Sequence, residues 1–349
     1  MKKSLLALAA LTAFAGAASA QSSVTLFGIV DLSVNSVKNG ALSQKLLSSN
    51  QLNSNRLGFR GVEDLGGGMR AGFWIEGAMN NDDGTGTATG GGQNWQRRST
   101  VSLMGGFGEV RLGRDYTPTF FNHTIFDPFG TNGLGSQLNV MLPQGTTSVF
   151  GGGATTTVRA SNSVSYFLPA MGGIYGQVMV AAGEGTPGNK YVGGRIGYAA
   201  GPVNVAVAYG KTEIVSNRDQ TALNVGGSFN LGFMTLLGQW HRYQTDVSTT
   251  VQRDQTNWMV GATVPFGAST LKASYNKVSS DGQDRDGNQI AVGYQYDLSK
   301  RTAIYATAAR VKNDGNAATG ARFSVGSGAA LQAGGQTSTG YNLGVRHSF

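Results

Sequence analysis

The 349-residue sequence contains no cysteine, and only 13% of its residues are charged. The lack of cysteine excludes disulfide bonds, thiolate zinc sites and cysteine nucleophiles. Long hydrophobic runs are also missing. Beyond residue 20 no stretch approaches the roughly 18 consecutive apolar residues that a transmembrane helix needs. Helical periodicity is equally scarce, which is unusual for a soluble chain of this length.

The first twenty residues have the pattern of a cleavable export signal. Lys2 and Lys3 give a positive start, residues 5–14 form an apolar centre, and the A-S-A of residues 18–20 is a small-residue cleavage site. The apolar centre is too short to cross a bilayer as a helix. We therefore expect a signal peptide over residues 1–20 and one folded domain over residues 21–349.

What the sequence does contain is alternation with a period of two residues. Segments about ten residues long carry apolar side chains at every second position and small or polar ones between them. Val203, Val205 and Val207, for example, alternate with Asn204 and Ala206. Because so much of the second face is Gly, Ala, Ser or Thr, the pattern favours apolar side chains facing outward and polar ones facing inward.

The number and spacing of these segments predict the fold. Sixteen segments alternate between short turns and longer polar loops such as residues 80–93 and 314–337. They are residues 23–35, 52–62, 68–79, 94–104, 107–115, 156–167, 173–182, 189–199, 202–213, 219–230, 233–245, 253–264, 269–279, 286–297, 301–313 and 338–349. This predicts an all-β, 16-stranded antiparallel transmembrane β-barrel, in which the last strand closes on the first and leaves no sheet edge.

Aromatic residues support a membrane position for this barrel. Several lie at outward parity toward strand ends, where they are typical of the girdles at membrane surfaces. They are Tyr166, Tyr198, Tyr209, Trp240, Trp258, Tyr275, Tyr294 and Tyr296.

The longest connection, residues 116–155, is a candidate functional loop. Its part over residues 117–130 is richer in aromatic and apolar residues than a solvated loop needs. A 16-stranded barrel encloses an aqueous lumen with room for an inserted segment. We expect this loop to fold inward against the wall.

Four motifs resemble one known family. They are SVTLFG at residues 23–28, NRLGFRGVEDLGGG at 55–68, GFGEVRLGRDYTP at 106–118 and GVRHSF at 344–349. Together they resemble the general trimeric porins of Gram-negative outer membranes, in the β-proteobacterial branch, over essentially the whole mature chain. The resemblance implies a homotrimer in outer-membrane lipid and lipopolysaccharide, and passive diffusion of ions and small hydrophilic solutes with no cofactor and no enzymatic activity. It also implies an inward third loop that forms a constriction, and a role for Phe349 in the signal read by the barrel-assembly machinery.

Strand parity identifies the charged side chains that reach the lumen. Arg97 has the outward parity; the inward parity belongs to Arg56, Arg60, Arg70, Glu76, Arg98 and Arg159. Similar porins carry a basic cluster on the wall opposite acids of the third loop. Carried over by motif, this assigns the basic wall to Arg56, Arg98 and Arg159, and the acidic side to Glu76 and the expected loop residues Asp115 and Asp127. Without the two signal lysines the formal charge falls from +8 to +6, which favours anions.

Other functions have less support in the sequence. Gly210-Lys211-Thr212 lacks the first glycine of a phosphate-binding loop, and residues 281–288 have the wrong spacing for a calcium loop. His123, His241 and His347 lie alone on separate elements, and no metal site is expected. Basic and aromatic residues are not interleaved as nucleic-acid binding requires, despite a pI near 9.7. A channel with a solute-specific site, an outer-membrane enzyme and a surface adhesin remain as alternatives.

Overall fold

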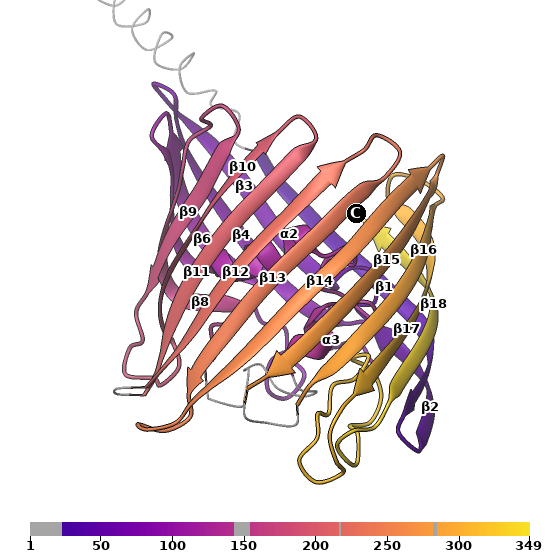
Figure 1. Cartoon of the computed structure of the whole chain (residues 1–349). Coiled ribbons are helices and arrows are strands. Elements are labelled where there is room, and N and C mark those ends of the chain that lie inside the picture. The colour runs from indigo at the N-terminus through magenta and orange to yellow at the C-terminus, as the bar shows by residue number, and fades with distance from the viewer. Residues whose placement is uncertain (1–22, 143–153, 216–217, 282–284) are drawn as a thin grey trace, which may run out of the picture.

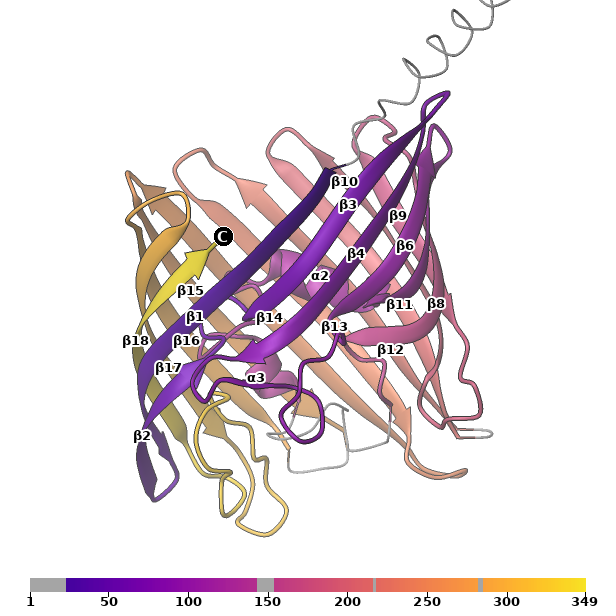
Figure 2. The ribbon, with the colours of Figure 1, turned by 180° about the vertical axis from the view of Figure 1, so that it is seen from behind.

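The computed structural model describes residues 23–142, 154–215, 218–281 and 285–349, and these form a closed β-barrel of tilted strands (Figures 1 and 2). The expected signal peptide, residues 1–20, lies outside the described residues. Among the described residues, no helix has the length and apolar character needed to cross a membrane.

The strands run in chain order around the barrel and pair antiparallel. They are β1 (Ser23–Asn39), β2 (Leu42–Ser49), β3 (Arg56–Gly66), β4 (Met69–Asn80), β5 (Thr85–Gly86), β6 (Arg98–Gly105), β7 (Gly108–Tyr116), β8 (Arg159–Phe167), β9 (Ile174–Ala181), β10 (Lys190–Ala200), β11 (Val203–Val215), β12 (Arg218–Asn230), β13 (Thr235–Asp246), β14 (Gln252–Phe266), β15 (Ser269–Ser280), β16 (Gly287–Asp297), β17 (Thr302–Asn313) and β18 (Ser338–Ser348). β2 and β3 pair one after the other along β1, and β5 is a short extension beside β4. The wall built by the described residues therefore has sixteen strands, as predicted.

The barrel closes where β18 meets β1. These strands pair from Ile29 with Ser348 to Asn39 with Ser338. Phe349 completes the seam, because its backbone N–H donates to the Gly28 carbonyl at 3.0 Å and its carbonyl accepts from the Gly28 N–H at 3.0 Å. The Phe349 ring covers Gly28 so closely that a Cβ there would come within 2.2 Å of it. Closure satisfies the backbone groups that an open edge would expose to lipid.

The predicted alternation of outward apolar and inward polar residues is confirmed. On β1 and β18, Val34 and Leu343 expose 63% and 66% of their surface on the outer face, whereas Asp31 and Asn35 are buried toward the interior. Outward aromatic residues are likewise exposed: Tyr198, Tyr209, Trp240, Trp258, Tyr294 and Tyr296. This distribution is typical of a barrel whose outer surface contacts lipid.

The first hairpin extends further than the predicted segments 23–35 and 52–62. β1 and β2 pair up to Asn39 and Leu42, and the chain then turns inward over residues 50–55. Asp31 holds this inward segment, because its Oδ2 accepts hydrogen bonds from the backbone N–H groups of Leu52 at 2.7 Å and Asn53 at 2.5 Å. Single-sequence alternation missed this, since residues 42–49 carry polar side chains on both faces.

The connection between β7 and β8 is hereafter the third loop, and its helical part over residues 117–142 lies inside the barrel (Figures 1 and 2). It contains α2 (Pro118–Phe126) and α3 (Leu138–Met141). Thr117 caps α2 by accepting a hydrogen bond from the Phe120 N–H at 3.4 Å, and Pro118 occupies the first turn, where its missing N–H costs nothing. α2 packs against β10, β11 and β12. The predicted inward folding of residues 117–130 is confirmed.

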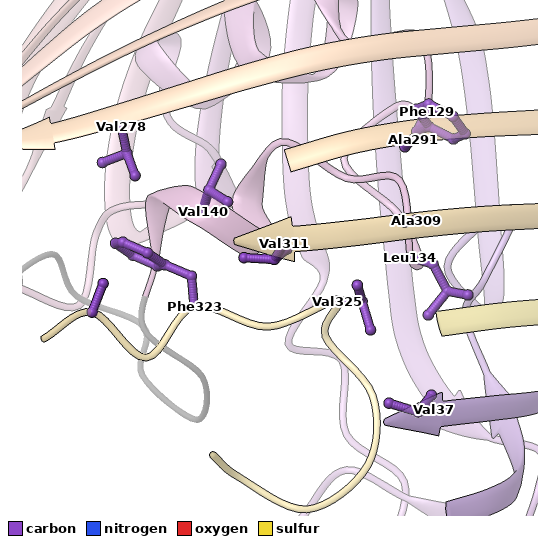
Figure 3. Close-up of a cluster of buried hydrophobic side chains, with 11 residues drawn as sticks. Val37, Phe129, Leu134, Val140, Val278, Ala291, Ala309, Val311, Phe323 and Val325 are labelled. Carbon is purple, nitrogen blue, oxygen red and sulfur yellow. The ribbon is translucent and has the colours of Figure 1, made fainter. Parts of the chain in front are cut away.

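A cluster of buried apolar side chains joins the third loop to residues 314–337 (Figure 3). Phe323 and Val325, which follow β17, pack together with Leu134 and Val140 of the third loop. Residues 314–337 form a loop between β17 and β18, as predicted, but part of this loop is buried, which its polar composition did not predict. Their few apolar side chains are scattered among Gly, Ser and Ala, so the sequence contains no hydrophobic run that would predict the burial.

Candidate functional site

Glu76 on β4 is the centre of a cluster of arginines inside the barrel. Its Oε1 lies 2.6 Å from Nε of Arg97 and 3.3 Å from Nη1 of Arg56. Its Oε2 accepts a hydrogen bond from the indole N–H of Trp74 at 3.0 Å. The carboxylate is only 6% exposed, so it needs these partners to remain charged.

The side chain of Arg97 points into the barrel, whereas strand parity had predicted that it points outward. β6 begins only at Arg98, and the backbone N–H of Arg97 donates to the Glu76 carbonyl at 3.1 Å. Because Arg97 precedes the regular ladder, strand alternation does not fix its direction, and its side chain turns inward to Glu76. The sequence contained the residue but no signal for its orientation.

Arg159 on β8 stands beside this cluster. Its Nε donates to the Arg97 carbonyl at 2.7 Å, and its guanidinium lies 4.4 Å from the ring centroid of Tyr116. Tyr116 in turn receives a hydrogen bond from Nη2 of Arg97 at 3.4 Å. The Arg56 Nε is anchored to the Ser54 carbonyl at 2.9 Å. Three guanidinium groups are thus held in fixed positions around one carboxylate.

Lys272 and Asp127 face these arginines across a cavity of about 530 Å³. Lys272 comes from β15, whereas Asp127 follows α2 in the third loop. The Asp127 carboxylate accepts backbone hydrogen bonds from Phe129 at 2.9 Å, Thr131 at 3.1 Å and Gln137 at 3.0 Å. Burial raises the pKa of Asp127 to about 6, despite these hydrogen bonds. Lys272 was missed by the sequence analysis, although its inward parity on β15 could have identified it.

Two of the expected site residues lie elsewhere. Arg98 lines a neighbouring cavity rather than this one, and its guanidinium lies 4.5 Å from the ring centroid of Trp74. Asp115 lies on β7 and not in the third loop. It pairs with Arg111 at 2.5 Å and with Arg98 at 3.6 Å, so it belongs to the basic wall itself. Of the residues assigned from the resemblance, Arg56, Arg159 and Asp127 line the same cavity.

The third loop reaches the wall over glycines. A Cβ on Gly226 would come within 2.2 Å of the Phe126 ring, and on Gly293 within 2.8 Å of the Phe129 ring. Gly261 gives the same room to Pro128, at 2.6 Å. Since these glycines lie on alternate strands β12, β14 and β16, they form a shallow track in which the loop rests.

Two histidines fix α2 to β13. His123 contacts Gln239 through Nδ1 at 3.1 Å and the Tyr243 hydroxyl through Nε2 at 2.9 Å. The His241 ring lies 4.7 Å away, edge to face. The expectation that the histidines lie alone was therefore wrong for this pair. Burial lowers the pKa of His123 to about 4. No group of three potential metal ligands is found in the described part of the chain.

A membrane-spanning barrel with a charged, loop-narrowed lumen defines a diffusion channel. Comparison with known proteins then identifies the family: the chain belongs to the Gram-negative porin family, whose model matches residues 7–316. It is therefore an outer-membrane porin, a passive channel and not an enzyme, as the sequence motifs had implied.

Individual relatives agree with this assignment. The chain is 39% identical to outer membrane porin protein 32 of Delftia acidovorans, with 100% of both chains covered. It is 30% identical to an outer membrane porin protein of Bordetella pertussis, over 90% of this chain and 95% of the relative. Among solved structures, the anion-selective porin from Comamonas acidovorans matches with a TM-score of 0.80 and 34% identity, covering 94% of this chain and 100% of that one.

Proposed function

We propose that this porin favours anions, and that Arg56, Arg97, Arg159 and Lys272 set this preference at its constriction. The observation that carries the proposal is the charge balance around one cavity. Four cationic side chains line it, against the carboxylates of Asp127 and the adjoining Glu76, which leaves two positive charges without a partner. The relative described as an anion-selective porin supports the same sign.

The expected size of the effect follows from the distance over which these charges act. At about 4 Å in a water-filled passage, one unit charge is worth about 1 kcal/mol to a passing ion. Removing one charge should therefore lower anion permeability about fivefold and raise cation permeability about fivefold, so that the anion-to-cation permeability ratio falls about 30-fold. Charges on the outer loops contribute less, since salt screens them over about 10 Å.

Reversal potentials across a KCl gradient test this proposal in planar bilayers. We expect the unmodified porin to favour chloride, and Arg159→Gln and Lys272→Gln each to lower its anion-to-cation permeability ratio about 30-fold. A cation-favouring potential of the unmodified porin would contradict the proposed selectivity while leaving the pore intact.

β15 offers a matched control for the lysine. Lys277 lies five residues after Lys272 on the same strand but at outward parity, and it is exposed. Lys277→Gln changes the total charge by the same amount as Lys272→Gln. We expect it to leave the reversal potential unchanged. Equal effects of the two substitutions would indicate a response to overall charge and not to the constriction.

Arg98 has a different place in this scheme. It contributes positive charge from the neighbouring cavity, where Asp115 partly compensates it at 3.6 Å. We expect Arg98→Gln to reduce the anion preference less than Arg159→Gln does, measured in the same KCl gradient.

Assembly and export complete the proposed function. We propose a homotrimer embedded in outer-membrane lipid and lipopolysaccharide, exported with loss of residues 1–20 and inserted by the barrel-assembly machinery, which recognises Phe349. The apolar outer face suits both lipid and subunit contact. Cross-linking of purified porin tests the trimer, and N-terminal sequencing tests the cleavage after Ala20.

A further inference from the structure

A second cavity, of about 410 Å³, lies beyond the constriction on the side of the short turns. It is lined by β1, β3, β4, β6 and β7, which pair in that order, and the first four of these lie side by side in Figure 2. Trp74 connects the two spaces. Its indole N–H donates to Glu76 of the constriction at 3.0 Å, while its ring lines the second cavity. A solute that leaves the constriction thus meets this cavity next.

Arg60 is the free cation of this cavity. Its exposed guanidinium lies 5.1 Å from the ring centroid of Phe27 and 5.0 Å from that of Trp74. Within the described residues it forms no ion pair. Contact with aromatic rings orients a guanidinium but leaves its N–H groups available to an anion. Arg98 adds a second guanidinium above Trp74, at 4.5 Å.

Glu109, which lines this cavity, and the nearby Asp115 are both already paired with an arginine. Arg111 holds Glu109 through two contacts, at 2.8 and 3.0 Å, and Asp115 at 2.5 Å. Its guanidinium also lies 4.1 Å from the Phe167 ring centroid. Because Arg111 holds both carboxylates, they compete little for Arg60. A visiting carboxylate would find one cation free and one only partly compensated.

The floor of the cavity is apolar, which is unusual for the polar interior of such a barrel. Gly72 lies between Val62 and Met104. A Cβ at Gly72 would come within 3.0 Å of the Met104 Cε and 3.8 Å of the Val62 Cγ2. The methyl group of Met104 therefore already covers Gly72, and Val62 and Met104 together give this part of the cavity an apolar lining next to the guanidinium groups.

We propose that this cavity is a binding subsite for small carboxylates with a flat apolar body, such as an aromatic ring. The carboxylate would pair with Arg60 and Arg98, and the apolar body would lie against Val62 and Met104. A volume of about 410 Å³ falls within the range of small-molecule sites. The inference deepens the proposed anion pore and rests on it, since it names a class of solute that the pore would retain briefly on the way through.

Benzoate is a suitable probe, with acetate as the matched anion that lacks the ring. In single-channel recordings in KCl, benzoate should reduce the chloride current in a saturable manner, whereas acetate at the same concentration should not. Arg60→Gln should raise the half-blocking concentration of benzoate about tenfold, as expected for loss of a charge-assisted hydrogen bond. Gly72→Val, which pushes against the Met104 methyl group and narrows the cavity, and Met104→Ser, which replaces an apolar lining residue by a polar one, should also raise it.

Arg70→Gln is the control. Like Arg60, Arg70 is an exposed arginine, but it lies on β4 and is not among the residues that line the cavity. It should leave the block by benzoate unchanged. The proposal is overturned if acetate blocks as well as benzoate, if benzoate does not block, or if Arg60→Gln and Gly72→Val leave the half-blocking concentration unaltered. Anion preference in KCl without any benzoate effect would refute the subsite alone, and loss of anion preference would refute the proposed pore function.

Discussion

Acid should act on the third loop through two buried groups of opposite sign. His123 sits against β13 in its neutral form, and Asp127 is buried beside the constriction. Both lie in the loop itself, so both change environment when the loop leaves the wall. Replacing one at a time should separate their effects on docking of the loop.

The magnitudes follow from the pKa changes between the docked and the released loop. The pKa of His123 is about 4 when docked and 6.5 when free, so its contribution to docking is complete above pH 6.5 and is lost as the pH falls to 4. The pKa of Asp127 is about 6 when docked and 3.8 when free, so its contribution is complete below pH 3.8 and is lost as the pH rises through 6. Each change is worth about 3 kcal/mol.

Because the chain has no native cysteine, thiol labelling can report release of the loop. Ser136 is buried in the third loop, so a Ser136→Cys thiol should react only when the loop opens. In an Asp127→Asn background the labelling rate should rise by about two orders of magnitude from pH 7 to pH 4. In a second background, His123 and its neighbour His241 are both changed to Gln. There the labelling rate should rise from pH 4 to pH 7.

Thiol reagents themselves react faster at higher pH, so each rate is divided by that of an exposed Thr249→Cys thiol. In the otherwise unmodified porin the two responses oppose each other, and the normalised rate should vary little with pH. A normalised rate that stays flat from pH 7 to pH 4 in the Asp127→Asn background would refute the role of His123 in holding the loop.

Three further predictions concern the wall, the constriction and the seam. Gly293→Val should displace the Phe129 ring and with it the third loop, which changes single-channel conductance without unfolding the barrel; unchanged conductance would contradict the close packing. Glu76→Gln should increase the anion preference in a KCl gradient and lower stability to denaturant by about 3 kcal/mol, because it breaks a buried ion pair; unaltered stability would argue against that pair. Phe349→Ala should slow barrel folding, measured by the gel shift between unfolded and folded forms, yet leave the conductance of the folded pore the same.

The strands, their facing and the inward loop could be predicted from sequence because each depends on local pattern. A period of two residues fixes which face of a strand meets lipid, as Val34 and Asp31 illustrate. The apolar content of residues 117–130 was likewise sufficient, since a loop with such a composition needs burial. Family motifs then pointed to Arg56 and Arg159, which line the same cavity inside the barrel.

The errors arose where the outcome depends on contacts between distant segments. Arg97 stands one residue before its strand, so only its ion pair with Glu76 decides its direction. His123 and His241 are in contact because the third loop packs on β13. The sequence near either residue does not predict this packing. Phe323 and Val325, in the loop over residues 314–337, are buried for the same reason, by packing on the third loop.

The glycines of this chain have different structural roles, and only some of these roles are visible in the sequence. Many glycines serve turns or the small-residue inner face, as the alternation suggests. Gly226, Gly261 and Gly293 differ, because each lies under a ring or a proline of the third loop. Gly72 is different again, since the methyl group of Met104 lies over it and no described residue of the third loop lines the cavity beside it. If Gly72 only supplied a small residue for the inner face, its substitution would affect benzoate binding no more than substitution of any other inner-face glycine. A loss of benzoate binding there, with the loop still docked, requires a site that the barrel keeps open for a solute.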